Sequence, residues 1–381
     1  MSLLSLGFRP FYALAAVFAV VALVVWLRAV TGLSGTGVVL NSVIWHSHEM
    51  LFGFAAAVIA GFLFTAVRNW TGLPTPSGAL LAALAVLWCA ARVLLVTGPG
   101  LLAAAIDVAF LPAVAAAIAV PIIRSRNQRN YKVLLILAAL ATLNGVFHLA
   151  NLSYLPASWL RASLFASIDV LVILLAVVAG RVIPAFTKNA VPESSPRNEY
   201  WVEWVSFASL LLVALVSLLL ASRVPPLLLA VLLIVTAAAH ATRLGLWDPV
   251  KTLHNPLLWM MPVAYSWIPF ALLLRALAVV QVVPPGAYIH AVTIGAISSF
   301  MLAMMMRSSL GHTGRPLVAS RSDMAAFLLL QCAAIMRVVA SIAAGPSWRA
   351  WVIAASLIWI IAFLVFALRY LPMLVRPRLT G

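Results

Sequence analysis

The sequence places two histidines and a carboxylate side by side at the start of a long apolar stretch. The run Trp45-His46-Ser47-His48-Glu49 continues through residues 50–67 without a further charge until Arg68, which is long enough to cross a bilayer. Ionisable side chains within a membrane segment are costly and usually functional. Imidazoles are common protein ligands for iron and copper. The run therefore indicates metal chemistry inside a membrane.

The composition indicates what kind of protein must position this run. The chain has 381 residues, of which 65% are hydrophobic and 8% are charged, and its mean hydropathy is +1.14. This excludes a soluble globular domain and indicates a polytopic α-helical membrane protein. The net charge of +16 indicates basic loops on one side of a membrane, and no nucleic acid partner is expected. Cys89 and Cys332 lie far apart and outside any C-x-x-C-H motif, so we expect neither c-type haem attachment nor a disulfide framework.

Hydrophobic runs separated by charges, prolines and glycines predict about twelve transmembrane helices. They cover approximately residues 10–29, 44–67, 79–97, 101–123, 131–153, 160–182, 200–221, 225–243, 255–279, 287–306, 322–343 and 348–370. The longest polar interruption, about 183–199, is too short to form a soluble domain. We therefore expect an all-α fold in which residues 1–381 form a single transmembrane domain.

The basic residues predict how the spans are oriented. Loops on one side of the predicted membrane contain 17 of the 24 lysines and arginines, and Arg337 lies within a span. By the positive-inside rule, both termini are then cytoplasmic.

The predicted topology gives each histidine a depth. Four histidines on three spans share a layer about 5–8 Å inside the outer boundary, at 1.5 Å of rise per residue. They are His46, His48, His148 and His290, and all four are candidate metal ligands. The other three, His240, His254 and His312, fall at the cytoplasmic face, and their roles stay open.

Helical spacing separates the roles of the two neighbouring histidines. Residues two apart on a helix point about 200° apart, so His46 and His48 are not expected to bind one metal. His46 shares a face with Glu49, and that pair could hold a non-haem metal or relay protons. His48 suits an axial haem ligand, with His290 as its partner. His148 is either a further ligand or a hydrogen-bond partner of a neighbouring helix.

The buried charged residues can be interpreted in two ways, and the sequence does not decide between them. In one, Arg337 forms an ion pair with Asp107 or Asp169, which offsets the cost of burial. In the other, Arg337 or Arg92 binds a haem propionate, and an acid such as Glu49 or Asp169 conducts protons.

Four stretches of the chain resemble the NnrS family and occur in the expected order. They are Leu6-Gly7-Phe8-Arg9-Pro10-Phe11, the run from Trp45 to Phe54, the run from Gly180 to Asn189, and Gly311-His312-Thr313-Gly314-Arg315-Pro316-Leu317. The resemblance implies a bacterial inner-membrane protein of about twelve helices, associated with haem and copper, that acts in the response to nitric oxide (NO). Arg181, His312 and Arg315 lie in these stretches and are further candidate site residues.

Two comparisons limit what the resemblance implies. Members of the family usually have a histidine three positions after the tryptophan of Leu257-Leu258-Trp259, and here that position is Pro262. The main subunit of haem–copper oxidases and NO reductases is a distant analogy, with twelve spans and histidines near the outer face of spans 2, 6 and 10. Span 6 here has Asp169 at that depth, so the three-histidine copper site of those enzymes is not reproduced. Analogy of fold alone assigns no chemistry.

These observations predict a haem-binding membrane protein that handles NO and relieves nitrosative stress, for example in denitrification. The haem is expected to be b-type, copper is the second candidate cofactor, and the lipid bilayer is the other partner. An oxidoreductase resembling NO reductase is one form of this activity, whose electron donor the sequence does not give. The alternative is a secondary transporter of twelve spans without a redox cofactor. Transporters bind substrates near the midplane, whereas the polar groups here gather near the outer face.

Overall fold

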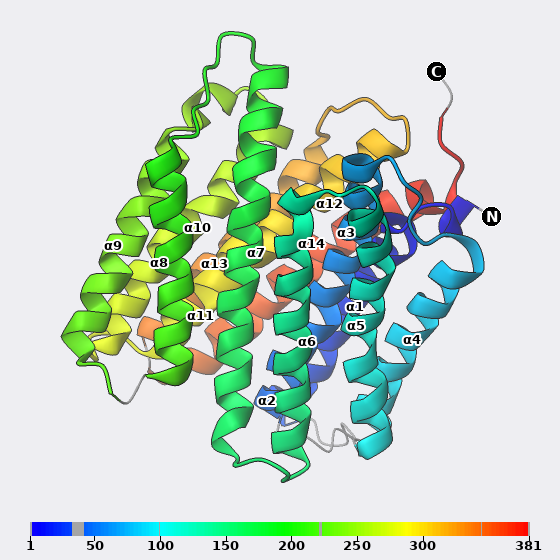
Figure 1. The fold of residues 1–381 in the computed structure, drawn as a ribbon. Coiled ribbons are helices and arrows are strands. Elements are labelled where there is room, and N and C mark those ends of the chain that lie inside the picture. Colours follow the sequence, from blue (N-terminus) through cyan, green and yellow to red (C-terminus); the bar gives the residue numbers. More distant parts are fainter. Residues whose placement is uncertain (1, 33–41, 99, 221–222, 344, 380–381) are drawn as a thin grey trace. The chain divides into compact units, whose positions relative to one another are not determined.

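The computed structural model describes residues 2–32, 42–98, 100–220, 223–343 and 345–379. Within these ranges the chain forms helices and no strand (Figure 1). Twelve helical segments are long and apolar enough to cross a membrane. The predicted all-α fold and number of spans are therefore confirmed.

Ten of the twelve spans are single helices, and most of them follow the predicted ranges closely. The single-helix spans are α1 (Phe8–Thr31), α4 (Gly78–Thr97), α5 (Leu101–Arg124), α6 (Tyr131–Asn151), α7 (Ser158–Ala190), α8 (Tyr200–Leu219), α9 (Pro226–Gly245), α10 (Pro256–Val279), α13 (Arg321–Ile342) and α14 (Trp348–Val375). The second span joins α2 (Ser42–His48), the π-helix η2 (Glu49–Ala55) and α3 (Ala56–Thr71). The tenth joins α11 (Pro285–His290), the π-helix η5 (Ala291–Ser298) and α12 (Ser299–His312).

Two spans run further than predicted. Helix α7 continues to Ala190, past Arg181 and Pro184, although the sequence pattern ended it near residue 182. Helix α12 continues to His312, which was expected in a loop. Charge and proline mark where a chain leaves the bilayer, but a helix can continue beyond that boundary because its backbone hydrogen bonds are satisfied internally.

Contacts divide the chain into two compact units, which we describe separately. The first unit comprises Met1–Ser167, Ser308–Pro316 and Phe363–Gly381. The second comprises Ile168–Arg307 and Leu317–Ala362. The expectation of a single transmembrane domain over residues 1–381 stays a prediction.

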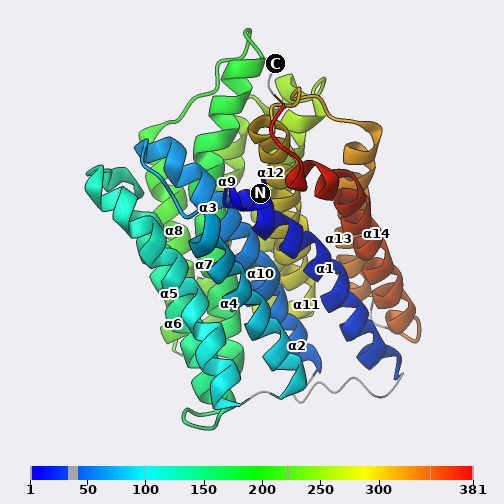
Figure 2. The same ribbon diagram turned by 90° about the vertical axis from the view of Figure 1, so that its right-hand side faces the viewer.

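The first unit is built on close packing of its early helices. Helix α1 packs against α3, and α4, α5 and α6 run side by side (Figures 1 and 2). Helix α1 buries Ala15, Ala19 and Ala22 completely, three to four residues apart. Such a stripe of small residues lets two helix backbones approach closely within a membrane. This packing provides the frame for the polar side chains of α2, α4, α5 and α6.

Each of the two π-helices begins directly after a histidine. Segment η2 follows His48, and η5 follows His290. A π-helix uses hydrogen bonds between residues five apart and is often found at functional sites. The hydrophobic pattern does not predict either segment.

Candidate metal centre

His48, the last residue of α2, is completely buried and held at both ring nitrogens. Its Nδ1 lies 2.9 Å from Oε1 of Glu49. Its Nε2 lies 3.0 Å from Oδ1 of Asn144 and 3.2 Å from Oδ2 of Asp107. Its ring stacks on Phe147 with 4.5 Å between centroids. The imidazole is therefore fixed in both position and orientation.

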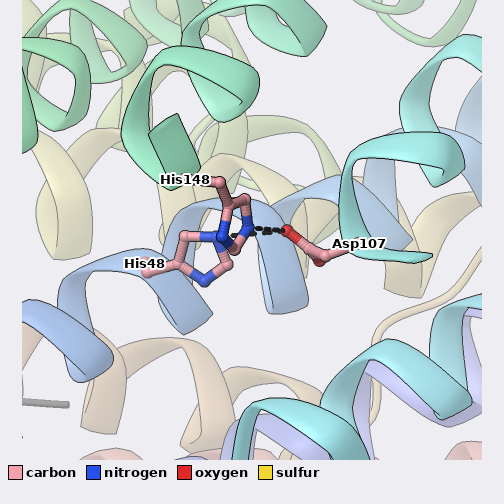
Figure 3. Close-up of side chains that lie close together, drawn as sticks. All are labelled: His48, Asp107 and His148. Carbon is pink, nitrogen blue, oxygen red and sulfur yellow. Dashed lines mark hydrogen bonds and ion pairs between the residues drawn. The ribbon is translucent and has the colours of Figure 1, made fainter. Parts of the chain in front are cut away.

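Two other helices bring further ligand atoms to His48. His148 on α6 places Nε2 2.9 Å from Oδ2 of Asp107 on α5. One ligand atom from each of His48, Asp107 and His148 lies within 4.8 Å of the others (Figure 3). All three side chains are buried. We call these three residues the His–Asp–His cluster.

Arg92 on α4 supplies a positive charge beside the cluster. Its NH1 donates to Oε1 of Glu49 at 2.8 Å, and its NH2 forms an ion pair with Asp107. Gly53 in η2 leaves room for this side chain, because a Cβ at that position would lie 3.0 Å from NH1 of Arg92. Trp88, one turn before Arg92, donates from Nε1 to the carbonyl of Gly53 at 3.1 Å. Helix α4 is thereby joined to the π-helix at the level of the cluster.

Asn144 joins His48 to Asp107. Its amide nitrogen donates to Oδ2 of Asp107 at 2.8 Å, and its oxygen lies 3.0 Å from Nε2 of His48. Arg92 supplies the positive charge that the buried carboxylates of Glu49 and Asp107 require.

The donor set suits a first-row transition metal. Two imidazoles and one carboxylate, with positions left open, are typical ligands of non-haem iron, and imidazole also suits copper. A metal cation would bind Nε2 of His48. Glu49 would then accept from Nδ1, the arrangement that orients many metal-ligating histidines. The residues present therefore fit a metal ion.

The structure combines only part of the predicted ligand set. His48 and His148 lie together, whereas the ring of His46 stacks on Trp26 with 4.5 Å between centroids. The predicted pairing of His46 with Glu49 is replaced by the bonds from Glu49 to His48 and Arg92. The physical reason is packing, since Arg92 on α4 and Nδ1 of His48 take the carboxylate of Glu49 while Trp26 on α1 takes the ring of His46.

The two acids that one reading paired with Arg337 bond to other arginines. Asp107 pairs with Arg92 in the first unit. In the second unit Asp169 pairs with Arg275, at 2.6 Å between Oδ1 and NH1. Arg337 instead places NH2 2.9 Å from Nε2 of His290. Predicted depth along the helices does not say which helices are neighbours, and that is what selects the partner of each acid.

The remaining candidate residues lie outside the cluster. His290 and Arg337 belong to the second unit and His48 to the first, so the predicted haem pair of His48 and His290 stays a prediction. His312 packs its ring 5.6 Å from that of Phe8. Arg181 and Arg315 are half-buried. Asp107 was considered in the sequence only as a buried acid and a possible ion-pair partner of Arg337, and no sequence signal pointed to Asn144.

Twelve apolar helices and a buried group of histidines and acids define a multi-pass membrane protein with a candidate metal centre. One family profile, described as NnrS protein, matches residues 2–378. The chain therefore belongs to the NnrS family, and membership suggests a membrane protein of the nitric oxide response. No curated protein matches the chain.

Proposed function

We propose that this protein is a bacterial inner-membrane metalloprotein that binds NO at a metal ion held by the His–Asp–His cluster. The observation that carries the proposal is the convergence of three buried ligand atoms, from three helices, within 4.8 Å. The family supplies the connection with NO. Copper and iron are the candidate metals, because the donor set suits both.

The residues around the cluster have separate tasks in this proposal. His48, His148 and Asp107 hold the metal, which supplies an open coordination position for NO. Glu49 orients His48 through its Nδ1 hydrogen, and Arg92 offsets the second carboxylate. A fixed hydrogen-bond acceptor of this kind sets the ring orientation and the basicity of a ligating histidine.

The surroundings of the cluster suit a small apolar ligand. His48 lies against the rings of Phe52 and Phe147, with centroids 5.1 Å and 4.5 Å away. NO partitions into a bilayer and needs no polar channel to reach a buried site. The same apolar shell keeps water from the metal and so favours binding of a neutral gas.

A b-type haem remains part of the proposal as an alternative occupant of His48, with His48 and His290 as its predicted axial ligands. It would take the ring nitrogen of His48 that the cluster metal otherwise uses and would replace the contact of His290 with Arg337. Haem would supply redox chemistry for the reduction of NO, whereas a metal ion in the cluster alone would permit binding and detoxification. An optical spectrum of the reduced minus the oxidised protein distinguishes the two, because b-type haem gives sharp bands and the His–Asp–His cluster does not.

The first experiment is metal analysis of purified protein loaded anaerobically with copper or iron. We expect one metal ion bound per chain in the wild type and in His254→Ala, whose histidine is exposed in the second unit. His148→Ala removes a ligand and should lose the metal together with the spectroscopic signature of bound NO. Equal metal content in the wild type and His148→Ala would refute the site.

A further inference from the structure

The second unit repeats part of the local arrangement of the first. In the first unit, His48 is followed by a π-helix, and the next span contributes Arg92. In the second unit, His290 is followed by a π-helix, and the next span contributes Arg337. The two arrangements differ at the residue after the histidine, which is Glu49 in the first unit and Ala291 in the second.

This difference leaves Arg337 without an acidic partner among the described residues. Three other arginines in the membrane spans bond to carboxylates: Arg92 to Glu49, Arg243 to Glu203, and Arg275 to Asp169. Arg9 has no carboxylate either, but its guanidinium donates to two backbone carbonyls near the end of the chain. Arg337 is 9% exposed, and within the described ranges no carboxylate lies within 4.0 Å of it.

His290 does not neutralise Arg337. The guanidinium can only donate, so Nε2 of His290 accepts at 2.9 Å and carries no hydrogen. The hydrogen is on Nδ1, which donates to the carbonyl of Gly286 at 2.8 Å. The imidazole is therefore neutral and fixed, and Arg337 keeps a full positive charge inside a membrane span.

One end of the Arg337 guanidinium is also left without a hydrogen-bond partner. Its NH1 is buried and has no acceptor among the described residues. A buried charge without a counter-charge is strongly destabilising, and a buried donor without an acceptor adds to that cost. Both costs are removed by a single anion placed at NH1.

We propose that Arg337, oriented by His290, binds a monovalent carboxylate-like anion. That anion would do in the second unit what the carboxylate of Glu49 does in the first. Two sources have this chemistry: a small free anion such as formate or nitrite, and the carboxylate of a bound organic cofactor. The inference goes beyond the proposed function, because it does not depend on a metal in the first unit.

The test measures thermal unfolding of the purified protein in rising sodium formate or sodium nitrite, with ionic strength held constant by sodium sulfate. If a free anion binds, the unfolding midpoint of the wild type rises and saturates, by about 3 °C or more. Arg337→Met should abolish this rise. Arg349→Met should keep it, because Arg349 is an exposed arginine of the same unit.

A second measurement identifies a cofactor as the source. Small molecules released by acid denaturation are compared by mass spectrometry between the wild type and Arg337→Met. If a cofactor carboxylate occupies the site, the wild type is insensitive to formate and nitrite but releases an organic acid that Arg337→Met lacks. The proposal is overturned if neither anion stabilises the wild type, no such acid is released, and Arg337→Met is at least as stable as the wild type. Metal content measured on the same samples tests the proposed function separately.

Discussion

At the scale of single residues, His48 is held by two carboxylates that have different roles. Asp107 also contacts His148, so it can share a metal with both histidines. Glu49 bonds to the opposite ring nitrogen of His48 and to Arg92. Glu49 is therefore a positioning residue in the proposed centre, whereas the sequence analysis gave it a direct role in holding a metal or conducting protons.

This assignment predicts a graded effect of substitutions on metal binding. Glu49→Gln keeps a hydrogen-bond acceptor but loses the charge that supports His48, and we expect metal affinity to fall by about 10–100-fold. His148→Ala removes a ligand and should abolish binding. Competition titrations with a chromophoric chelator measure both. Glu193→Gln, at an exposed acid, serves as the control. Affinity in Glu49→Gln equal to that of the wild type would contradict the role of Glu49.

The sequence predicted the histidines of the site better than its other members. His48 and His148 were expected in one layer and lie together in the structure. Asp107 was known to be buried, but its pairing with Arg92 depends on α4 and α5 being neighbours. Asn144 is an ordinary polar residue in an apolar helix. Only the packing shows that it joins His48 to Asp107.

At the scale of elements, the packing of the π-helix η2 against helix α4 depends on the absence of a side chain at Gly53. A Cβ there would lie 2.5 Å from Cε1 of Phe18 and 3.0 Å from NH1 of Arg92. Neither contact can be kept without a shift, because the first is a ring packed against Trp88 and the second belongs to an ion pair.

Gly53→Ala should therefore lower the free energy of unfolding by about 1–3 kcal/mol, the usual cost of overpacking. Gly145→Ala is the matched control within the same unit, because a Cβ on α6 at that position meets nothing within 4 Å. There we expect stabilisation of up to about 1 kcal/mol, since glycine weakens a helix interior. Thermal or denaturant unfolding in detergent measures both. Equal effects of the two substitutions would contradict the close packing at Gly53.

The spans were predictable because hydropathy alone determines which segments can cross a membrane. The lengths of the spans were less predictable. Helix α7, for example, continues through Pro184 to Ala190. The π-helices could not be predicted, because residues 50–55 and 291–298 are mostly apolar and their hydropathy does not distinguish one helical geometry from another.

At the scale of the whole molecule, the distribution of basic residues makes a prediction that the fold does not test. With twelve spans and 17 of 24 lysines and arginines on one side, both termini should be cytoplasmic. A fluorescent protein fused after Gly381 should be fluorescent, whereas alkaline phosphatase fused there should be inactive. The opposite pair of results would require an odd number of spans or a reversed orientation.

The π-helix η2 also has a consequence for insertions and deletions in this segment. An α-helix turns by about 100° per residue. If one residue of η2 were deleted and the segment became α-helical, the residues before η2 would be rotated relative to α3 by roughly that angle. His48 would then face away from α5 and α6, although the hydropathy of the span would hardly change. A shortened sequence of this kind would still read as a twelve-span membrane protein while having lost its metal centre. When related sequences are compared, the number of residues between His48 and α3 should therefore be inspected, rather than only the presence of two histidines.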